Sequence, residues 1–341
     1  MRDAKRPSGQ KANSARECRA VHCAAILPEP DPMSFSLPSL PSAKLGHPAR
    51  RLGRPRLLIV GCGDVGMRVL GLLAGRWQVR ALSSSPDRFA ELRAAGAQPV
   101  LGNLDAPASL VGLAGWADAV LHLAPPQGQG VRDLRTLNLL RALARRSKPA
   151  HLVYASTTGV YGDCAGARFD ESRPVAPRSD RARRRVDAER LLRGFGPTFG
   201  CRVTILRVPG IYAGNRVGGH PRERLQHGAP VLRREEDVYT NHIHADDLAR
   251  ACLRALWRGA PQRVLHVCDD SELLMGDYFD LAADLCGLSR PPRISREEAQ
   301  SQMSAMQLSF MSESRRLSNR RLKAELGLKL RYPRPEDGLL A

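Results

Sequence analysis

Residues 56–66 read RLLIVGCGDVG, an apolar run that leads directly into three closely spaced glycines. RLLIV has the character of a buried strand, and apolar residues recur at helical spacing after the glycines, so the glycines lie in a strand-to-helix turn. Gly61 would allow the tight turn, Gly63 would let the backbone approach a phosphate, and Gly66 would let the helix pack on the strand. The stretch predicts the pyrophosphate site of a dinucleotide cofactor. The expected contacts are Gly61, Gly63, Asp64, Val65 and Gly66.

The sequence after this turn alternates short apolar runs with amphipathic stretches, a pattern typical of βαβ units. Strands are predicted at residues 56–60, 77–82, 97–102, 118–124, 150–156 and 202–208. Helices are predicted from the glycine turn onward and at 86–95, 131–146, 184–194, 246–257 and 274–287. The fold class is therefore α/β, a Rossmann-type doubly wound parallel sheet with a smaller C-terminal substrate lobe. Ligands of such sheets bind beyond the carboxyl ends of the strands.

Composition predicts how the chain is divided. Residues 1–54 are rich in proline, serine and basic residues, which predicts a disordered basic extension. We expect an NAD(P)-binding Rossmann domain over 55–212 and a substrate-covering lobe over 213–341, with 239–258 returning to the Rossmann core. No apolar run approaches the roughly 18 residues that a membrane span requires. We therefore expect a cytoplasmic protein with no membrane partner.

The net charge of +19 and the isoelectric point near 10.5 are those of many nucleic-acid-binding proteins. The excess is mostly arginine scattered along the chain, however, without a basic stripe interleaved with aromatic residues. We therefore expect no nucleic-acid partner. The 8 cysteines form no CxxC pair, so the sequence predicts neither a metal site nor a disulfide framework.

The end of the second predicted strand, LSSSPDR at 82–88, bears on which dinucleotide binds. NAD-selective sites place a carboxylate there, about 20 residues after the glycines, to bind the ribose hydroxyls. Ser83, Ser84 and Arg88 would instead bind a 2′-phosphate, which favours NADP. NAD remains the alternative because Asp87 lies in the same segment, where it would otherwise cap the next helix. Arg88 would otherwise be a solvated helix residue.

Two further strand ends add expected cofactor contacts. Asn103 and Leu104 follow the third strand, where an adenine would lie, and Leu123, Ala124 and Pro125 follow the fourth strand, beside the nicotinamide-side ribose. The loop at 127–130 reads QGQG, and it either closes over a ligand or is a plain surface loop.

Three motifs follow the glycine turn in order: YASTTGVYGD at 154–163, LRVPGIYAG at 206–214 and NHIHADDLA at 241–249. With the turn, they resemble the extended short-chain dehydrogenase/reductase superfamily, in its NAD-dependent epimerase/dehydratase group, over about residues 56–332. The resemblance adds Pro209 and Ile211 to the expected cofactor contacts. It also implies a small-molecule substrate and a homodimer.

The catalytic motif of that superfamily is altered in this chain. The resemblance implies a YxxxK motif whose tyrosine exchanges a proton while hydride moves, and a serine or threonine that binds the substrate oxygen. The tyrosine and lysine positions hold Arg181 and Arg185 here. Arg181, with a pKa above roughly 12, cannot exchange protons near neutrality. This replacement resembles the atypical members of the superfamily called YeeZ-like.

Thr157 is the first candidate for substrate contact, against the alternative that it only ends a strand. Tyr161 would supply a phenol or pack within its turn. Arg181 and its arginine neighbours at 183–185 would clamp an anionic substrate or form the solvated face of a helix. The catalytic candidates are Thr157, Tyr161, Arg181 and Arg185.

Several other polar residues are expected to stabilise the fold rather than to act on a ligand. We expect structural roles for His242 and His244, with His244 a candidate lobe contact, and a helix cap at Asp246 or Asp247. Glu171 would line the cleft or lie in a surface loop. Two functions follow: an NADP-dependent oxidoreductase or epimerase acting on an unidentified small substrate, or a non-catalytic sensor of NADP(H).

Overall fold

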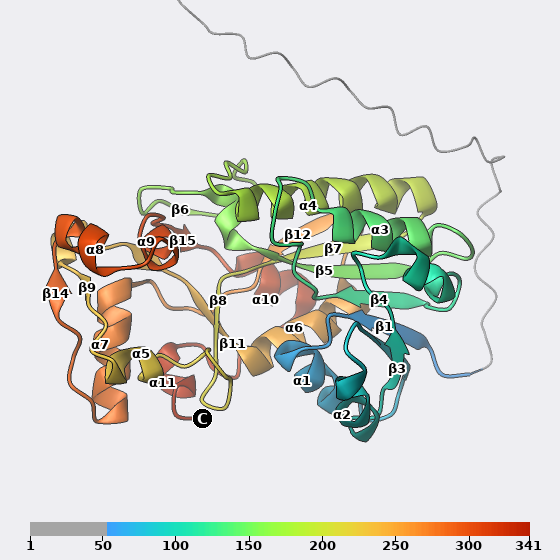
Figure 1. The fold of residues 1–341 in the computed structure, drawn as a ribbon, viewed down its shortest axis with the longest axis horizontal. Coiled ribbons are helices and arrows are strands. Elements are labelled where there is room, and N and C mark those ends of the chain that lie inside the picture. Colours follow the sequence, from blue (N-terminus) through green and yellow to red (C-terminus); the bar gives the residue numbers. More distant parts are fainter. Residues whose placement is uncertain (1–52) are drawn as a thin grey trace, which may run out of the picture. The chain divides into compact units, whose positions relative to one another are not determined.

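A seven-stranded sheet forms the centre of the computed structural model, which describes residues 53–341 (Figure 1). Every neighbouring pair of its strands is parallel. Their order across the sheet is β12 (Arg263–His266), β7 (Arg202–Val208), β5 (His151–Thr157), β4 (Ala119–His122), β1 (Arg56–Val60), β2 (Gln78–Ser83) and β3 (Gln98–Leu101). The chain leaves β1 toward one edge and returns through β4 toward the other, so the order reverses between these strands. In doubly wound folds the cofactor binds at this reversal.

The six strands predicted from the sequence are confirmed, with ends that move by at most two residues. The seventh strand, β12, was not predicted. It has only four residues, RVLH, and it pairs with β7 in the register Val264 to Ile205 although a long lobe segment separates the two strands in sequence. Residues 1–52, which hold nearly all of the predicted disordered extension, lie outside the described residues.

Both faces of the sheet are buried, because alternate residues of β1 contribute to different cores. Leu57 and Ile59 belong to one apolar cluster, and Leu58 and Val60 belong to the other. Figure 1 shows helices on each face. The first cluster is covered by α1 (Asp64–Leu73), α2 (Phe89–Ala94), α6 (Ala245–Arg258) and α10 (Arg320–Leu326). The second is covered by η2 (Pro107–Leu113), α3 (Leu134–Leu143) and α4 (Asp180–Phe199).

The helix signals in the sequence are borne out, with shifted ends. α3 starts where the Asp133 side chain accepts a hydrogen bond from Thr136 N. α4 is longer than predicted, because Ser179 caps it early and Gly200, in a left-handed conformation, ends it. The predicted 86–95 helix is divided into η1 (Pro86–Arg88) and α2. No helix of residues 53–341 has the length and apolar character needed to cross a membrane.

Segments after β7 build a further apolar cluster beside the sheet. Tyr212, Leu225, Val231 and Phe279 are among its buried members. The helices in these segments are α5 (Arg222–Gln226), α7 (Met275–Cys286), α8 (Arg296–Gln302), α9 (Ala305–Phe310) and α11 (Pro335–Gly338), with η4 (Arg234–Glu236). Short strands pair two by two: β8 (Gly210–Tyr212) with β11 (His242–His244), β9 (Val231–Leu232) with β14 (Arg293–Ile294), β10 (Tyr239–Thr240) with β13 (Leu273–Leu274), and β6 (Arg168–Phe169) with β15 (Arg316–Leu317). This cluster lies beyond the carboxyl end of β7, where the sequence places the substrate side.

Candidate functional site

Two glycines of the turn between β1 and α1 are required by the packing of the protein itself. Gly61 has a φ of +83°, and a Cβ there would lie 2.4 Å from the backbone nitrogen of Ala124. A Cβ on Gly66 would lie 2.9 Å from Cys62 Sγ and 3.6 Å from Ile59 Cγ2. Gly61 therefore permits the turn beside the end of β4, and Gly66 permits α1 to approach β1.

Gly63 is different, because no protein atom occupies the place of its side chain. A Cβ on Gly63 would have no heavy atom within 4 Å, and the residue is exposed. Gly63 is also the N-cap of α1, and it makes no side-chain hydrogen bond to the amides of the first turn. A helix N-terminus whose amides face open space binds anions well, because the amides donate and the helix dipole is positive there. These residues fit the pyrophosphate of a dinucleotide.

Arg88 lies beside this turn. Its Nη1 donates to the carbonyl of Cys62 at 2.7 Å, and its Nε and Nη2 contact Glu91 Oε2 at 2.9 and 2.8 Å. The Ser83 hydroxyl is engaged locally, donating to Ser85 O at 3.0 Å, while Ser84 is exposed. The structure thus brings a guanidinium to the end of β2, next to the glycine turn. Glu91 would compete for that guanidinium with any incoming phosphate.

The loops after β3 and β4 are tied to each other at the same edge of the sheet. Arg135 makes a bidentate contact with the Asp105 carboxylate at 2.8 and 2.6 Å, which lowers the pKa of Asp105, and donates to Pro125 O at 3.4 Å. Asn103 Oδ1 accepts from Asp105 N at 2.9 Å. The remaining predicted contacts lie in these loops, where Leu104 is buried and the amides of Leu123 and Ala124 both donate to Val60 O.

A cleft of about 730 Å³ opens at the carboxyl ends of β5 and β7. Four residues predicted from the sequence line it: Thr157, Arg181, Pro209 and Ile211. Its opposite side is formed by residues of the later segments, among them His242, Tyr278, Glu313 and Arg315. The cleft is therefore assembled from segments that lie far apart in the sequence.

Thr157 ends β5 at the cleft and is partly exposed. Its hydroxyl accepts a hydrogen bond from Gly159 N at 3.3 Å and keeps its own proton available to donate. A Cβ on Gly159 would lie 3.8 Å from Thr157 Oγ1 and 4.0 Å from Glu313 Oε2, so the hydroxyl and the carboxylate both lie close to Gly159.

Tyr161 points away from the cleft into a buried polar network. Its side chain is 1% exposed, and its hydroxyl lies 2.5 Å from Arg207 Nη1 and 2.6 Å from His266 Nε2. His266 Nδ1 donates to Ser318 O, so Nε2 accepts the Tyr161 proton. Burial raises the pKa of Tyr161 to about 12, although Arg207 opposes the change. This placement favours a packing role over the supply of a phenol to a substrate.

Arg181 and Arg185 occupy different environments. Arg181 lines the cleft, and its pKa is lowered by desolvation and by the neighbouring Arg185. Arg185 Nη1 donates to Tyr154 Oη at 2.9 Å and to Ala155 O at 2.8 Å, which holds it against β5. Of this pair, only Arg181 is placed among the cleft residues.

Arg183 and Arg184, which lie between Arg181 and Arg185 in the sequence, are not among the cleft residues. Arg183 is exposed and pairs with Asp180 at 2.8 Å. Arg184 is buried and donates to the carbonyl of Gly130, which ties the QGQG loop to α4. Of the four arginines that would either clamp a substrate or form a solvated helix face, only Arg181 lines the cleft, and Arg183 is exposed.

The cap predicted for α6 was wrong. The helix begins after His244, whose Nδ1 accepts from Asp246 N, while Asp247 is fully buried and accepts from the amides of Arg331 and Tyr332. An aspartate in the first turn of the helix thus holds a segment that is distant in sequence. His244 also contacts the Tyr332 ring, with centroids 3.9 Å apart.

His242 and Glu171 also take positions that the sequence left open. His242 stacks on Tyr278 with ring centroids 3.8 Å apart, and burial lowers its pKa to about 3. Glu171 was expected to line the cleft or a surface loop, and neither expectation holds. It is buried, accepts from His266 N at 2.8 Å and pairs with Arg321 at 3.2 Å.

Sequence reasoning missed the cleft residues that come from the later segments. Glu313 and Arg315 pair at 2.6 Å in the segment before β15, and Arg216 follows β8. Of these residues, only Arg216 lies near a sequence motif, because it is two residues beyond LRVPGIYAG. The segment containing Glu313 has no motif, so only its position beside the cleft in the folded protein identifies it as part of the site.

A sequence profile described as "NAD dependent epimerase/dehydratase family" matches residues 57–268. The chain is 29% identical over 275 residues to the GDP-6-deoxy-D-mannose reductase of Pseudomonas aeruginosa, covering 71% of this chain and 86% of that protein.

Solved structures show the same fold. One is a functionally unknown conserved protein from Silicibacter pomeroyi, with 29% identity and a TM-score of 0.68 over 84% of this chain and 96% of that one. Another is the UDP-glucose 4-epimerase of Thermotoga maritima with UDP-glucose, with 19% identity and a TM-score of 0.68 over 84% and 96%. A third is a double mutant of dTDP-glucose 4,6-dehydratase from Streptomyces venezuelae with NAD bound, with 22% identity and a TM-score of 0.67 over 84% and 94%. The profile match covers more than half of the chain. The chain therefore belongs to the NAD dependent epimerase/dehydratase family.

Proposed function

We propose that this protein is an NADP-dependent oxidoreductase or epimerase that acts on a small anionic substrate. The observation that carries the proposal is Gly63, whose missing side chain leaves open space at the uncapped N-terminus of α1. Protein packing does not require a glycine there, whereas the close approach of a pyrophosphate does. The same turn lies at the reversal of strand order, between β1 and β4.

Arg88 supports NADP over NAD. A guanidinium at the end of β2, hydrogen-bonded to the glycine turn, is positioned to pair with a 2′-phosphate, and guanidinium–phosphate contacts are strong because both groups are charged. NAD remains the alternative because Glu91 already pairs with Arg88 and because the dehydratase from Streptomyces venezuelae holds NAD.

The charge of the cleft supports an anionic substrate. The described lining residues include the guanidinium groups of Arg178, Arg181, Arg216, Arg224 and Arg315, whereas Glu313 is their one carboxylate. A cleft lined by one sign of charge concentrates ligands of the opposite sign. The named relatives act on or bind sugar nucleotides, which are anionic, and this class is the first to test.

The residues of the cleft would divide the chemistry as follows. A bound nicotinamide would supply a hydride acceptor or donor. Thr157 would donate its hydroxyl proton to a carbonyl or hydroxyl oxygen of the substrate, and Arg181 would orient the anionic part. Since Tyr161 is buried and bonded to Arg207 and His266, water in the open cleft would carry the proton to solvent.

One observation favours a second candidate, a non-catalytic protein that senses NADP(H). The position of the family's proton-transferring tyrosine holds Arg181, and the nearby Tyr161 phenol is used internally. Such a chain would bind the cofactor and change its interaction with a partner without turnover.

A two-step experiment separates these functions. Thermal denaturation with NADP, NAD or neither tests binding, and a ligand at about 100 times its dissociation constant adds about 2.7 kcal/mol of stability. A panel of carbonyl compounds and sugar nucleotides is then screened by the absorbance of reduced nicotinamide and by product analysis for epimers. Turnover that disappears in Thr157→Ala while cofactor binding persists supports the enzyme. Stabilisation without turnover across the panel supports the sensor, and no stabilisation by either dinucleotide rejects both.

A further inference from the structure

The loop after β8, residues 213–221, is tied to the first turn of α1. Arg216 Nε donates to Asp64 Oδ2 at 3.2 Å. One residue earlier, Asn215 Oδ1 accepts a hydrogen bond from Arg68, which also contacts Asp64 Oδ1 at 3.2 Å and pairs with Asp246. Two successive loop residues therefore contact α1, and Arg216 reaches its first residue, Asp64.

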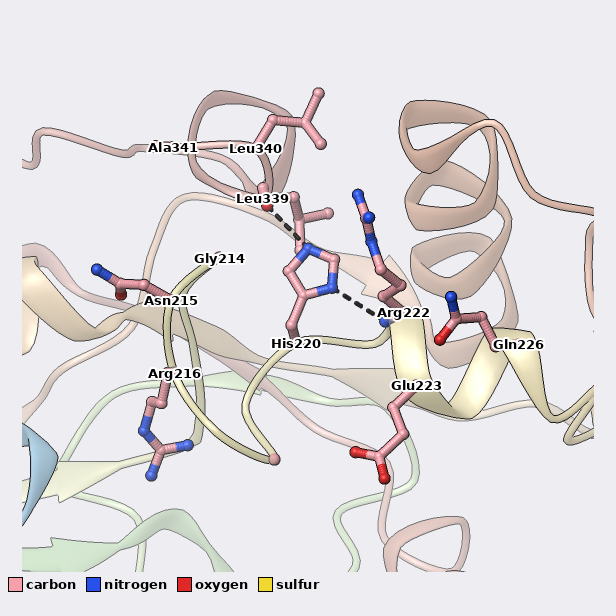
Figure 2. Close-up of a pocket in the computed structure, with 11 residues that line it drawn as sticks. Gly214, Asn215, Arg216, His220, Arg222, Glu223, Gln226, Leu339, Leu340 and Ala341 are labelled. Atoms are coloured by element: carbon pink, nitrogen blue, oxygen red, sulfur yellow. Dashed lines mark hydrogen bonds between the residues drawn. The ribbon is translucent and has the colours of Figure 1, made fainter.

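The other end of this loop is fixed as well. Figure 2 shows His220 between the loop and Leu339, with Nε2 donating to Leu339 O at 2.8 Å and Nδ1 accepting from Arg222 N at 3.0 Å. Arg216 Nη1 donates to Ile211 O at 3.2 Å, and a Cβ on Gly219 would lie 2.7 Å from Arg216 Nη1. The chain thus folds closely around the Arg216 side chain, which defines its position.

The electrostatics of this turn favour cations beside Asp64 when a dinucleotide binds. Asp64 is favourable in the first turn of α1 because it faces the positive end of the helix dipole. A pyrophosphate on the same amides would be repelled by the Asp64 carboxylate at short range. Arg68 within α1 and Arg216 from the loop each pair with the Asp64 carboxylate at 3.2 Å and together offset its charge where screening by solvent is incomplete.

We propose that Arg216 is a second anchor for the pyrophosphate, held beside the N-terminus of α1 by Asp64. The inference rests on the proposed function, since it assumes that a dinucleotide binds at Gly63. A guanidinium suits this role because its planar donors can bind a carboxylate and a phosphate oxygen together. Arg216 also lines the cleft, so the side chain that binds the cofactor contributes to the substrate wall.

The test is a calorimetric titration of the full chain and its Arg216→Ala and Arg216→Lys variants with NADP, NAD and adenosine 2′-monophosphate. Losing a charge-assisted contact weakens binding by about tenfold. Arg216→Ala should weaken NADP and NAD by the same factor, because both carry the pyrophosphate. Adenosine 2′-monophosphate lacks it and should bind as to wild type, and Arg216→Lys should lie between. Arg222→Ala, an exposed arginine beyond His220, is the matched control and should resemble wild type.

Each failure has a separate signature. If the wild-type chain binds neither dinucleotide, the proposed function fails. If the wild-type chain binds and Arg216→Ala binds equally well, the assignment of Arg216 fails while the proposed function stands. A parallel loss of adenosine 2′-monophosphate binding, or an equal loss in Arg222→Ala, also overturns the assignment, because it would show a general disturbance of the loop.

Discussion

Gly61 and Ala124 join the two strand ends between which the sheet order reverses. A Cβ on Gly61 would lie 2.4 Å from Ala124 N and 2.6 Å from Ala124 Cα, and the amides of Leu123 and Ala124 both donate to Val60 O. The turn after β1 and the loop after β4 are therefore one packed unit. The position of the glycine turn depends on this contact.

Gly61→Ala should destabilise the protein by about 2 kcal/mol or more, because it combines a positive φ with a backbone clash. Gly71→Ala is the control, since Gly71 lies in α1 and a Cβ there meets nothing within 4 Å. That variant should be stabilised by about 0.5–1 kcal/mol. Urea denaturation measures both. Equal stability of the two variants would show that the close contact is absent in solution.

Arg88→Ala should weaken NADP binding by about tenfold and leave NAD binding unchanged, because only NADP carries the 2′-phosphate. Titrations with both dinucleotides measure the change in selectivity. Arg93→Ala is the control, because Arg93 lies on α2, the helix that directly follows Arg88, and contacts the Phe89 ring instead of the glycine turn. An equal loss of NADP and NAD affinity in Arg88→Ala would remove its role in selectivity.

Much of the fold follows from local signals. The strands are short apolar runs, and the glycines from Gly61 to Gly66 indicate the first βαβ unit. Hydrophobic periodicity and turn residues therefore locate most of the strands. β12 was missed because four residues after a long insertion carry little periodicity, and its partner β7 identifies it only in space.

The candidate site was predictable only on its Rossmann side. Thr157 ends β5, and Pro209 and Ile211 come shortly after the end of β7; all three line the cleft, as residues at strand ends do in this fold. Glu313 and Arg315 come from a segment without a motif, so tertiary folding alone brings them there. At α6 the short-range rule for caps favoured an aspartate, but Asp247 accepts from the amides of Arg331 and Tyr332, contacts that the local sequence does not reveal.

Tyr161→Phe should lower the free energy of unfolding by about 1–3 kcal/mol, because it removes the hydroxyl partner of Arg207 Nη1 and of His266 Nε2 in a buried network. Dinucleotide affinity should stay at the wild-type value. Denaturation and titration of the same preparation measure both quantities. Wild-type stability together with lost turnover would instead indicate that the phenol takes part in the reaction.

The buried histidine His122 should make stability depend on pH. Burial lowers its pKa to about 3, against about 6.5 in an unfolded chain, so the folded state binds fewer protons between these values. The stability that depends on neutral His122 is fully present above about pH 6.5. It is lost as the pH falls toward 3, at about 1.4 kcal/mol per pH unit.

Asp269 changes the stability with pH in the direction opposite to His122, because burial raises the pKa of Asp269 to about 7. The His122 effect is therefore measured as a difference between wild type and His122→Gln, by urea denaturation from pH 7 down to about 5. As the pH falls, the free energy of unfolding of wild type should decrease more steeply than that of His122→Gln, by the effect of one bound proton, about 1.4 kcal/mol per pH unit. Equal slopes would mean that His122 is protonated or exposed in the folded protein.

The central claim is that the turn from Gly61 to Gly66 holds a dinucleotide. The most direct measurement is a calorimetric titration of wild type and Gly63→Asp with NADP and NAD. A Cβ at Gly63 meets open space, so the variant should fold normally while its carboxylate repels the pyrophosphate. The account predicts saturable binding to wild type, tighter for NADP, and loss of binding in Gly63→Asp at near wild-type stability. Failure of wild type to bind either dinucleotide, or unchanged binding in Gly63→Asp, would contradict it.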